Sequence, residues 1–109
     1  MTVLWVYMTA GNLEEARRIG EVLVKERLAA CVNMIDGMRS LYLWKDELQD
    51  DAETVLIAKT TSERLDRMVE TVKRLHSYEC PCIVALPSQG GNPEFLDWVR
   101  SCVEAPGDS

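Results

Sequence analysis

The side chains with the clearest chemical potential lie in one short segment that runs from His76 to Cys82. Cys80 and Cys82 flank a proline, and alternate residues of an extended segment point to the same side. With His76 just upstream, the two thiols can offer sulfur and imidazole ligands to a soft or borderline ion such as copper or zinc. Two other interpretations stay open. The cysteines also fit the entrance to a strand, and His76, which follows an expected helix, also fits a helix cap.

Lys59 is a second candidate, because it is a charged residue at the end of an otherwise apolar strand. A buried lysine needs a partner, and Glu79 and Asp97 can each supply a carboxylate. In one interpretation Lys59 forms a structural ion pair at a subunit boundary. In the other, Lys59, Tyr78 and Glu79 line a cleft between subunits that binds an anion or a small ligand.

Catalytic patterns are missing from the chain. The sequence contains no Ser-His-Asp order, no HExxH and no phosphate loop with Gly-Lys-Ser/Thr. The single histidine lacks a nucleophile unless Cys80 or Cys82 serves as one, which leaves a thiol-dependent enzyme or redox protein as a weaker hypothesis. We therefore expect no enzymatic activity, no catalytic residues and no organic cofactor.

Composition predicts one small domain. The chain has 109 residues, of which 47% are hydrophobic, and this length leaves no room for a second core. We expect the domain to span residues 1–104 and the tail 105–109, which lacks an apolar anchor, to be disordered. The net charge is −6, and lysines and arginines are scattered, so nucleic acid is not an expected partner.

The location of the protein is predicted from its N-terminus and its cysteines. The apolar segment 2–7 is too short to span a membrane and lacks the flanks of a signal peptide. Four cysteines are available, but a chain this rich in apolar residues does not need disulfides for stability. We expect free thiols, no membrane association and a cytoplasmic location.

The elements expected in the first half alternate between strands and helices. They are a strand over 3–8, a helix from 12 to about 28, a strand over 29–44 and a strand over 53–60. Asn12 and Glu15 form a capping-box pattern at the start of the helix. Gly37 predicts a bulge within the long strand, because glycine readily takes the positive φ that many bulges need. The polar stretch 45–51 predicts a chain reversal.

The second half of the chain contains the clearest helical periodicity. Thr61 or Ser62 can cap a helix in which apolar residues fall at i, i+3, i+4, i+7 and i+10, namely Leu65, Met68, Val69, Val72 and Leu75. The segment 82–86 is predicted to be the last buried strand, bounded by prolines. The pair Asn92-Pro93 opens a final helix that reaches Cys102.

The order β-α-β-β-α-β followed by a helix predicts an α+β, ferredoxin-like split βαβ fold, in which two helices cover one face of a four-stranded sheet. The strand 53–60 is apolar on both faces, so the second face also needs a cover. Large aromatic residues support the same conclusion. We therefore expect an oligomer whose subunit interface includes Trp5, Tyr42, Trp44 and Trp98.

Six short motifs stand in a fixed order along the chain. They are ERLAACVN at 26–33, YxW at 42–44, KTT at 59–61, HxYExP at 76–81, ALP at 85–87 and GNPxxLDW at 91–98. In order and spacing they resemble the CutA divalent-cation tolerance proteins, over roughly residues 3–103. The resemblance implies a homotrimer of ferredoxin-like subunits and a metal-binding histidine in the segment of His76.

The chain departs from this family at positions that bear on metal binding. Where the family usually has an acidic residue after the proline, this chain has Cys82, so its metal preference is expected to differ. The position in the first strand that is cysteine in some copper-binding members is Met8 here, a thioether that still favours copper(I). Asp46 replaces the usual hairpin glycine and tolerates the left-handed conformation that the turn needs.

The resemblance therefore implies a trimeric, cytoplasmic protein that binds copper or another divalent ion and takes part in the response to metal ions. Its predicted metal ligands are His76, Cys80, Cys82 and Met8. A second hypothesis is a regulatory sensor similar to the PII trimers, which share this topology and bind effectors in clefts between subunits.

Overall fold

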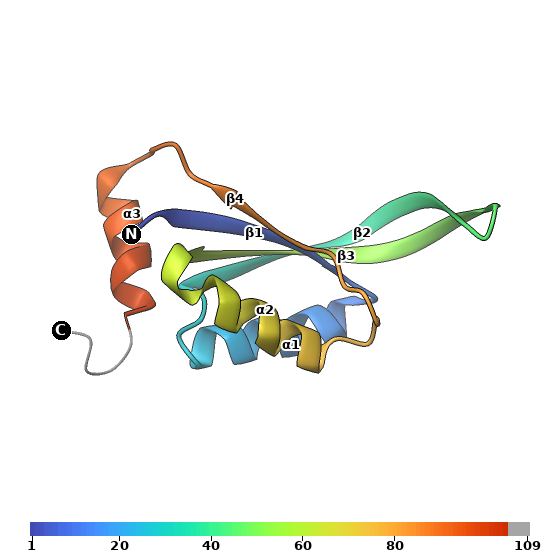
Figure 1. Cartoon of the computed structure of the whole chain (residues 1–109), viewed down its shortest axis with the longest axis horizontal. Helices are drawn as coiled ribbons and strands as arrows, with labels where there is room; N and C mark the ends of the chain where they lie inside the picture. The colour runs from blue at the N-terminus through green and yellow to red at the C-terminus, as the bar shows by residue number, and fades with distance from the viewer. Residues whose placement is uncertain (105–109) are drawn as a thin grey trace.

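The structure, a computed structural model, describes residues 1–104, and the tail 105–109, predicted to be disordered, lies outside them. The strands are β1 (Val3–Ala10), β2 (Cys31–Trp44), β3 (Glu47–Thr61) and β4 (Ile83–Pro87), and the helices are α1 (Leu13–Lys25), α2 (Leu65–Leu75) and α3 (Pro93–Cys102). One antiparallel sheet has the strand order β2-β3-β1-β4 (Figure 1). The ferredoxin-like split sheet with a C-terminal helix is therefore confirmed.

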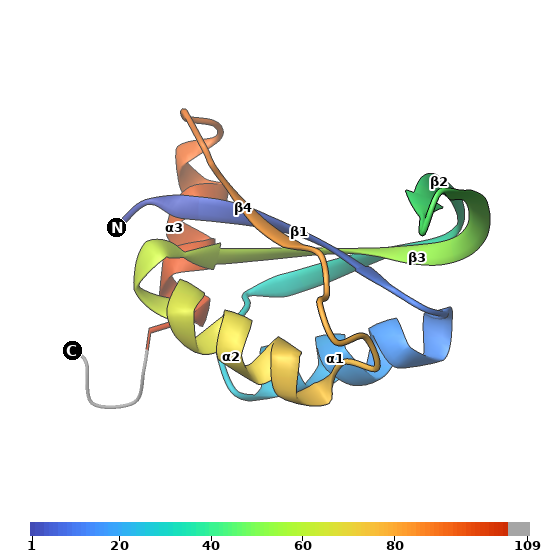
Figure 2. The same cartoon turned by 45° about the vertical axis from the view of Figure 1, so that its right-hand side comes forward.

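Helices α1 and α2 cover one face of this sheet, and both lie on the same side of it in Figure 2. Strand alternation sends every second side chain of β1 and β3 into this layer, where they meet the apolar stripes of the helices. The largest buried contributors are Leu4, Val6 and Met8 of β1, Ile19 and Leu23 of α1, Leu56 of β3, and Met68 and Val72 of α2. No described helix is long and apolar enough to cross a membrane.

Helix α1 begins as predicted and ends earlier than predicted. The Asn12 side chain accepts a hydrogen bond from the N–H of Glu15 at 2.8 Å, which confirms the N-cap. The helix ends at Lys25 rather than near Leu28, because Arg27 adopts a φ of 58°. The N–H of Arg27 then donates to the carbonyl of Val24, and the N–H of Leu28 donates to the carbonyl of Leu23, which is the pattern of a Schellman cap.

Strands β2 and β3 form a long hairpin that projects beyond the rest of the molecule (Figure 1). The chain does reverse within the predicted segment 45–51, but the reversal is shorter than predicted, because β3 already begins at Glu47 and its polar residues pair with β2. The turn is only Lys45 and Asp46, whose φ values of 52° and 66° are typical of a two-residue hairpin turn. The tolerance of Asp46 for a left-handed conformation is thereby confirmed.

The bulge predicted at Gly37 is confirmed, and it decides which side chains share a face. Between Ile35 and Met38 the register shifts so that β2 carries one extra residue, and Gly37 has a φ of 80°. A one-residue shift moves every later side chain to the opposite face. Beyond the bulge, Tyr42 and Trp44 therefore lie on the face that does not meet the helices.

Two predictions about the second half of the chain are wrong. A short 3-10 turn (Ser62–Arg64) precedes α2, and Thr61 stands at the start of that turn without a side-chain cap. The last strand, predicted to be buried, is an edge strand that pairs only with β1 in the described chain. Because one side of β4 lies on the face without helical cover, Val84 and Leu86 are 50% and 55% exposed.

Helix α3 covers only one end of this second sheet face (Figures 1 and 2). It begins as predicted, with Asn92 accepting a hydrogen bond from Glu94 and Pro93 in the first turn. Its inward residue Val99 is buried, and the helix contacts β1 and β3. The remainder, which we call the open face, carries apolar and aromatic side chains, including Trp5, Tyr7, Ile35, Ile57, Val84 and Leu86.

Candidate functional site

The loop after α2 is held in place by His76. Its Nε2 lies 2.7 Å from the carbonyl oxygen of Thr9, and its Nδ1 accepts the N–H of Tyr78 at 3.0 Å. Because Nδ1 accepts, Nε2 must carry the hydrogen and donate it to Thr9. His76 is the C-cap residue of α2, as one interpretation predicted, but its ring binds β1 and the loop. Both nitrogens are engaged, so the ring offers no free lone pair to a metal.

Glu15 fixes the same loop from the other side. Its carboxylate accepts the N–H groups of Gly11 and Ser77, each at 2.9 Å. Burial raises the pKa of this carboxyl, but the hydrogen bonds from Gly11 and Ser77, together with the nearby His76, outweigh it and hold the pKa below its usual value. The predicted capping box is therefore only half present, because Glu15 reaches Gly11 and Ser77 instead of the N–H of Asn12.

The loop, β1 and the hairpin together border an open cavity of about 670 Å³, which we call the acidic cavity. Its lining comes from Thr9 of β1, from Tyr42, Trp44, Gln49, Asp51 and Glu53 of the hairpin, and from Tyr78, Glu79, Cys80 and Cys82 of the loop. Three of these residues are carboxylates, and within residues 1–104 no lysine, arginine or histidine lines the cavity. Its charge therefore favours cations.

Two tyrosines hold carboxylates in the wall of the acidic cavity. The hydroxyl of Tyr42 donates to Asp51, and that of Tyr78 donates to Glu53 at 3.0 Å. Burial, followed by the hydrogen bond to Glu53, raises the pKa of Tyr78 to about 12. The hydrogen bond to Asp51 raises the pKa of Tyr42. Both phenols therefore stay protonated at neutral pH and leave the negative charge on the acids.

The two predicted thiol ligands line the acidic cavity, but the other two predicted ligands do not. Met8 is buried in the core on the helix-covered side of the sheet. Among residues 1–104 no three histidine, cysteine, aspartate or glutamate side chains are placed to hold a metal ion. The described residues of one chain thus do not gather into such a ligand set, and metal binding by Cys80 and Cys82 stays a prediction.

The thiol of Cys82 is poorly suited to nucleophilic chemistry. Burial, and then the nearby charge of Glu53, raise its pKa above the usual value for cysteine. A reactive cysteine needs a lowered pKa and a cationic neighbour, and this cavity lining contains no cation. The arrangement does not favour the thiol-dependent enzyme hypothesis.

Lys59 lies on the open face, outside the acidic cavity. It is only 6% exposed, its ammonium donates to the side-chain oxygen of Asn33, and it lies 4.9 Å from the centre of the Trp5 ring. Within the single chain neither predicted partner pairs with Lys59, because Asp97 pairs with Arg100 at 2.9 Å and Glu79 lines the acidic cavity. An ion pair across a subunit boundary stays a prediction. No carboxylate in the described chain pairs with Lys59. A cleft that combines Lys59 with Tyr78 and Glu79 stays a prediction about the assembled protein.

The four aromatic residues predicted at a subunit interface are all exposed in the single chain. Trp5, Tyr42, Trp44 and Trp98 are between 45% and 63% exposed. Trp5 lies on the open face beside Leu86 of β4. Tyr42 and Trp44 lie on the continuation of that face along the hairpin, where they line the acidic cavity.

Sequence analysis missed the acids of the hairpin. Asp51 and Glu53 fall at alternate positions of β3 with Gln49, so all three point to one face. This alternation was a usable signal, but the interpretation of 45–51 as a reversal concealed it.

Comparison with known proteins identifies the family to which this fold and cavity belong. The family model described as CutA1 divalent ion tolerance protein matches residues 4–102. The chain belongs to the CutA1 family. It is 48% identical in sequence to a divalent-cation tolerance protein CutA from Thermus thermophilus, and the match covers 87% of this chain and 92% of that protein.

Solved structures of CutA1 proteins have the same fold. A crystal structure of CutA1 from Oryza sativa and a structure of a CutA described as periplasmic from Archaeoglobus fulgidus superpose on this chain with TM-scores of 0.91 and 0.90. The Oryza sativa protein is 40% identical in sequence to this chain, and the match covers 94% of both chains. The Archaeoglobus fulgidus protein is 41% identical, and the match covers 94% of this chain and 99% of that one. The matched residues include every one that lines the acidic cavity, so in this CutA1 chain the cavity lies within the shared domain.

Proposed function

We propose that this protein acts in divalent-cation tolerance as a homotrimer that binds copper or another divalent ion and carries out no bond chemistry. The observation that supports this most is the acidic cavity, with three carboxylates, two thiols and no basic residue in the described lining. Carboxylate oxygens suit hard divalent ions, and thiols suit copper(I) and zinc. A cation is therefore the ligand that this chemistry favours.

The position of the cavity supports a site completed by another subunit. Asp51 and Glu53 lie on the same side of β3 as Lys59, so the cavity opens on the open face. If copies of the chain cover that face, a neighbouring subunit forms the missing wall of the cavity. Such a neighbour can supply the further ligands that a single chain lacks.

The absence of bond chemistry and the location are part of the same proposal. His76 has both ring nitrogens engaged, and the raised pKa of Cys82 disfavours a thiolate. The four cysteines are all free, which suits a reducing compartment and supports a cytoplasmic location. Fractionation of cells that make the protein tests the location, and recovery from a compartment outside the cytoplasm contradicts it.

Removing both cavity thiols should weaken copper binding. We expect the double variant Cys80→Ser, Cys82→Ser to raise the Kd of the reduced, full-length protein for Cu(I) at least about tenfold. Loss of a residue that only hydrogen-bonds to a metal ligand already lowers metal affinity by about tenfold, and loss of a ligand should lower it at least as much. Isothermal titration with Cu(I), and with Zn(II) for comparison, measures this. Cys102→Ser, a free cysteine on α3, is the matched control. Equal affinities in the double variant and the control contradict the site.

A sensor that binds a small anion between subunits is the second candidate, and Lys59 favours it. A buried ammonium whose described partners are an amide and an aromatic ring has no counter-charge, and a bound carboxylate or phosphate supplies one. The acidic cavity itself repels such ligands, so this candidate requires a different place on the open face.

Thermal unfolding tests the sensor hypothesis. If it holds, ATP, ADP or citrate at about 100 times its Kd stabilises the wild-type protein by about 2.7 kcal/mol without added metal. Lys59→Met keeps an unbranched side chain against Trp5 but removes the charge, so it should lose this stabilisation. Equal shifts in both proteins, or no shift in either, contradict the role of Lys59.

A further inference from the structure

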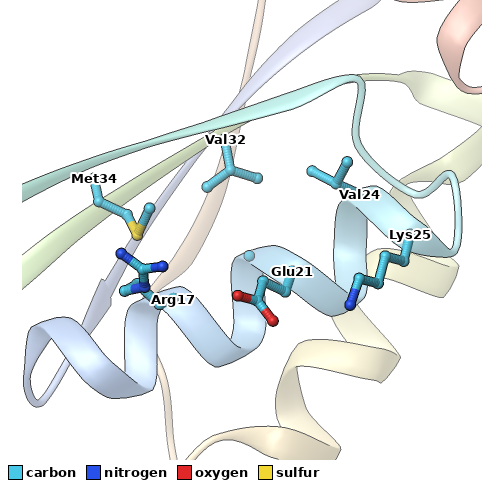
Figure 3. A pocket seen from close by; sticks show the side chains of 7 residues that line it. Arg17, Glu21, Val24, Lys25, Val32 and Met34 are labelled. Carbon is cyan, nitrogen blue, oxygen red and sulfur yellow. The ribbon is translucent and has the colours of Figure 1, made fainter.

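A second cavity, of about 330 Å³, lies between α1 and the edge strand β2 (Figure 3). We call it the α1/β2 cavity. Its helical wall contains Arg17, Gly20, Glu21, Val24 and Lys25, and its sheet wall contains Val32 and Met34. The helical residues fall at i, i+3, i+4, i+7 and i+8, which places them along one side of α1. Val32 pairs with Ala58 of the core, so the cavity lies on the helix-covered side, away from the open face.

The walls of the α1/β2 cavity are mainly apolar. Val24 and Met34 are 42% and 39% exposed, which leaves apolar side-chain surface available to a ligand. Gly20 brings the helix close to the strand, since a Cβ there would lie 3.3 Å from Val32 Cγ1. The volume falls at the small end of the range for small-molecule sites.

One charged group faces this apolar surface. In the view of Figure 3, Arg17 and Met34 line the same end of the cavity, whereas the carboxylate of Glu21 points away from Val32. Within residues 1–104, the side chains of Arg17 and Lys25 make no hydrogen bond or ion pair. The guanidinium of Arg17 therefore lies at the edge of an apolar cavity without an ion-pair partner within residues 1–104, and the carboxylate of Glu21 is one turn away on the same helix.

We propose that the α1/β2 cavity binds a small monocarboxylate with an apolar body. The hydrocarbon lies against Val24, Val32 and Met34, and the carboxylate pairs with Arg17. Guanidinium binds carboxylate through two parallel N–H donors, which gives both affinity and orientation. A neutral ligand of the same shape lacks this pairing, and an amine is repelled by Arg17 and Lys25. The proposal does not depend on metal binding or on the open face.

Hexanoate is a suitable probe, with hexanol and hexylamine as neutral and cationic controls of the same chain length. We expect hexanoate to shift the methyl NMR signals of Val24, Val32 and Met34 in the full-length protein, with a Kd on the order of 1 mM, as suits a ligand of this size. Hexanol and hexylamine should bind at least about threefold more weakly. Equal affinity for hexanol, or no saturable shift with hexanoate, overturns the proposal.

Three variants locate the binding. Arg17→Gln should weaken hexanoate binding about threefold to tenfold, in keeping with one partly exposed charge pair. Val24→Trp, at a half-exposed position that tolerates a larger side chain, should fill the cavity and remove the shifts of Val32 and Met34. Arg18→Gln removes an equal charge from the same helix at a residue outside this cavity lining, and should leave the Kd unchanged. Unchanged binding in Arg17→Gln or Val24→Trp overturns the proposal.

Discussion

Val84→Asp should convert the proposed trimer into single chains of 12.3 kDa. Val84 is half-exposed on the open face, where its neighbour across the strands is Tyr7. In a trimer that buries this face, the substitution places a carboxylate in each interface without a partner. An unpaired buried charge costs several kcal/mol, and the cost recurs in every interface of the ring. Dissociation returns each carboxylate to water and removes this cost.

Light scattering coupled to size-exclusion chromatography at micromolar concentration measures this effect directly. Val24→Asp is the matched control, because it makes the same change at a similarly exposed valine on the helix-covered side. The control should keep the wild-type mass. A trimeric Val84→Asp protein, or a wild-type protein that is already monomeric, contradicts the assembly through the open face and the completion of the acidic cavity by a neighbour.

Glu15→Ala should lower the free energy of unfolding by about 3 kcal/mol at neutral pH. The carboxylate is buried and accepts two backbone N–H groups, from Gly11 and Ser77, which the variant leaves without their partner. A hydrogen bond to a charged group contributes about 1.5–3 kcal/mol, and an unsatisfied buried donor costs about 1–3 kcal/mol. The loop that forms one wall of the acidic cavity should loosen at the same time.

The pH dependence separates this effect from a loss of packing. The folded pKa of Glu15 lies below its usual value of 4.5, so the ionised form is the one that stabilises the fold. Its contribution is complete above about 4.5 and is lost as the pH falls through the lower, folded pKa. Urea unfolding at fixed protein concentration should show the difference between wild type and variant shrinking over that window. Glu14→Ala, an exposed residue of the same turn, should change stability by less than about 0.5 kcal/mol.

Much of the fold could be predicted because its signals are local. The Asn12 cap, the apolar stripe of Met68 and Val72, and the helix opening at Pro93 each follow from residues within a few positions of one another. The errors arose where local signals misled. The polar residues at 47–51 suggested a loop, but pairs across the hairpin, such as Tyr42 with Asp51 and Arg39 with Asp50, make them a strand.

The candidate site was predicted only in part. Tyr78, Glu79, Cys80 and Cys82 do line one cavity, and their closeness in sequence made that grouping accessible. The acids that complete the wall of the cavity come from β3. The role of the His76 ring depends on the carbonyl of Thr9, which lies 67 residues earlier in the chain. Lys59 lacks the acidic partners that its sequence context suggested, because the register of β1 and β3 places it beside Trp5.

The sequence alone determined the order of strands and helices, the apolar sheet face without helical cover, and, through its six motifs, the family. These follow from periodicity and turn chemistry, which operate over a few residues. Only the tertiary structure decided which polar side chains meet in the acidic cavity and which ring nitrogens are engaged. Those contacts depend on strand register and on the single extra residue at the Gly37 bulge, which turns the rest of β2 to the other face of the sheet.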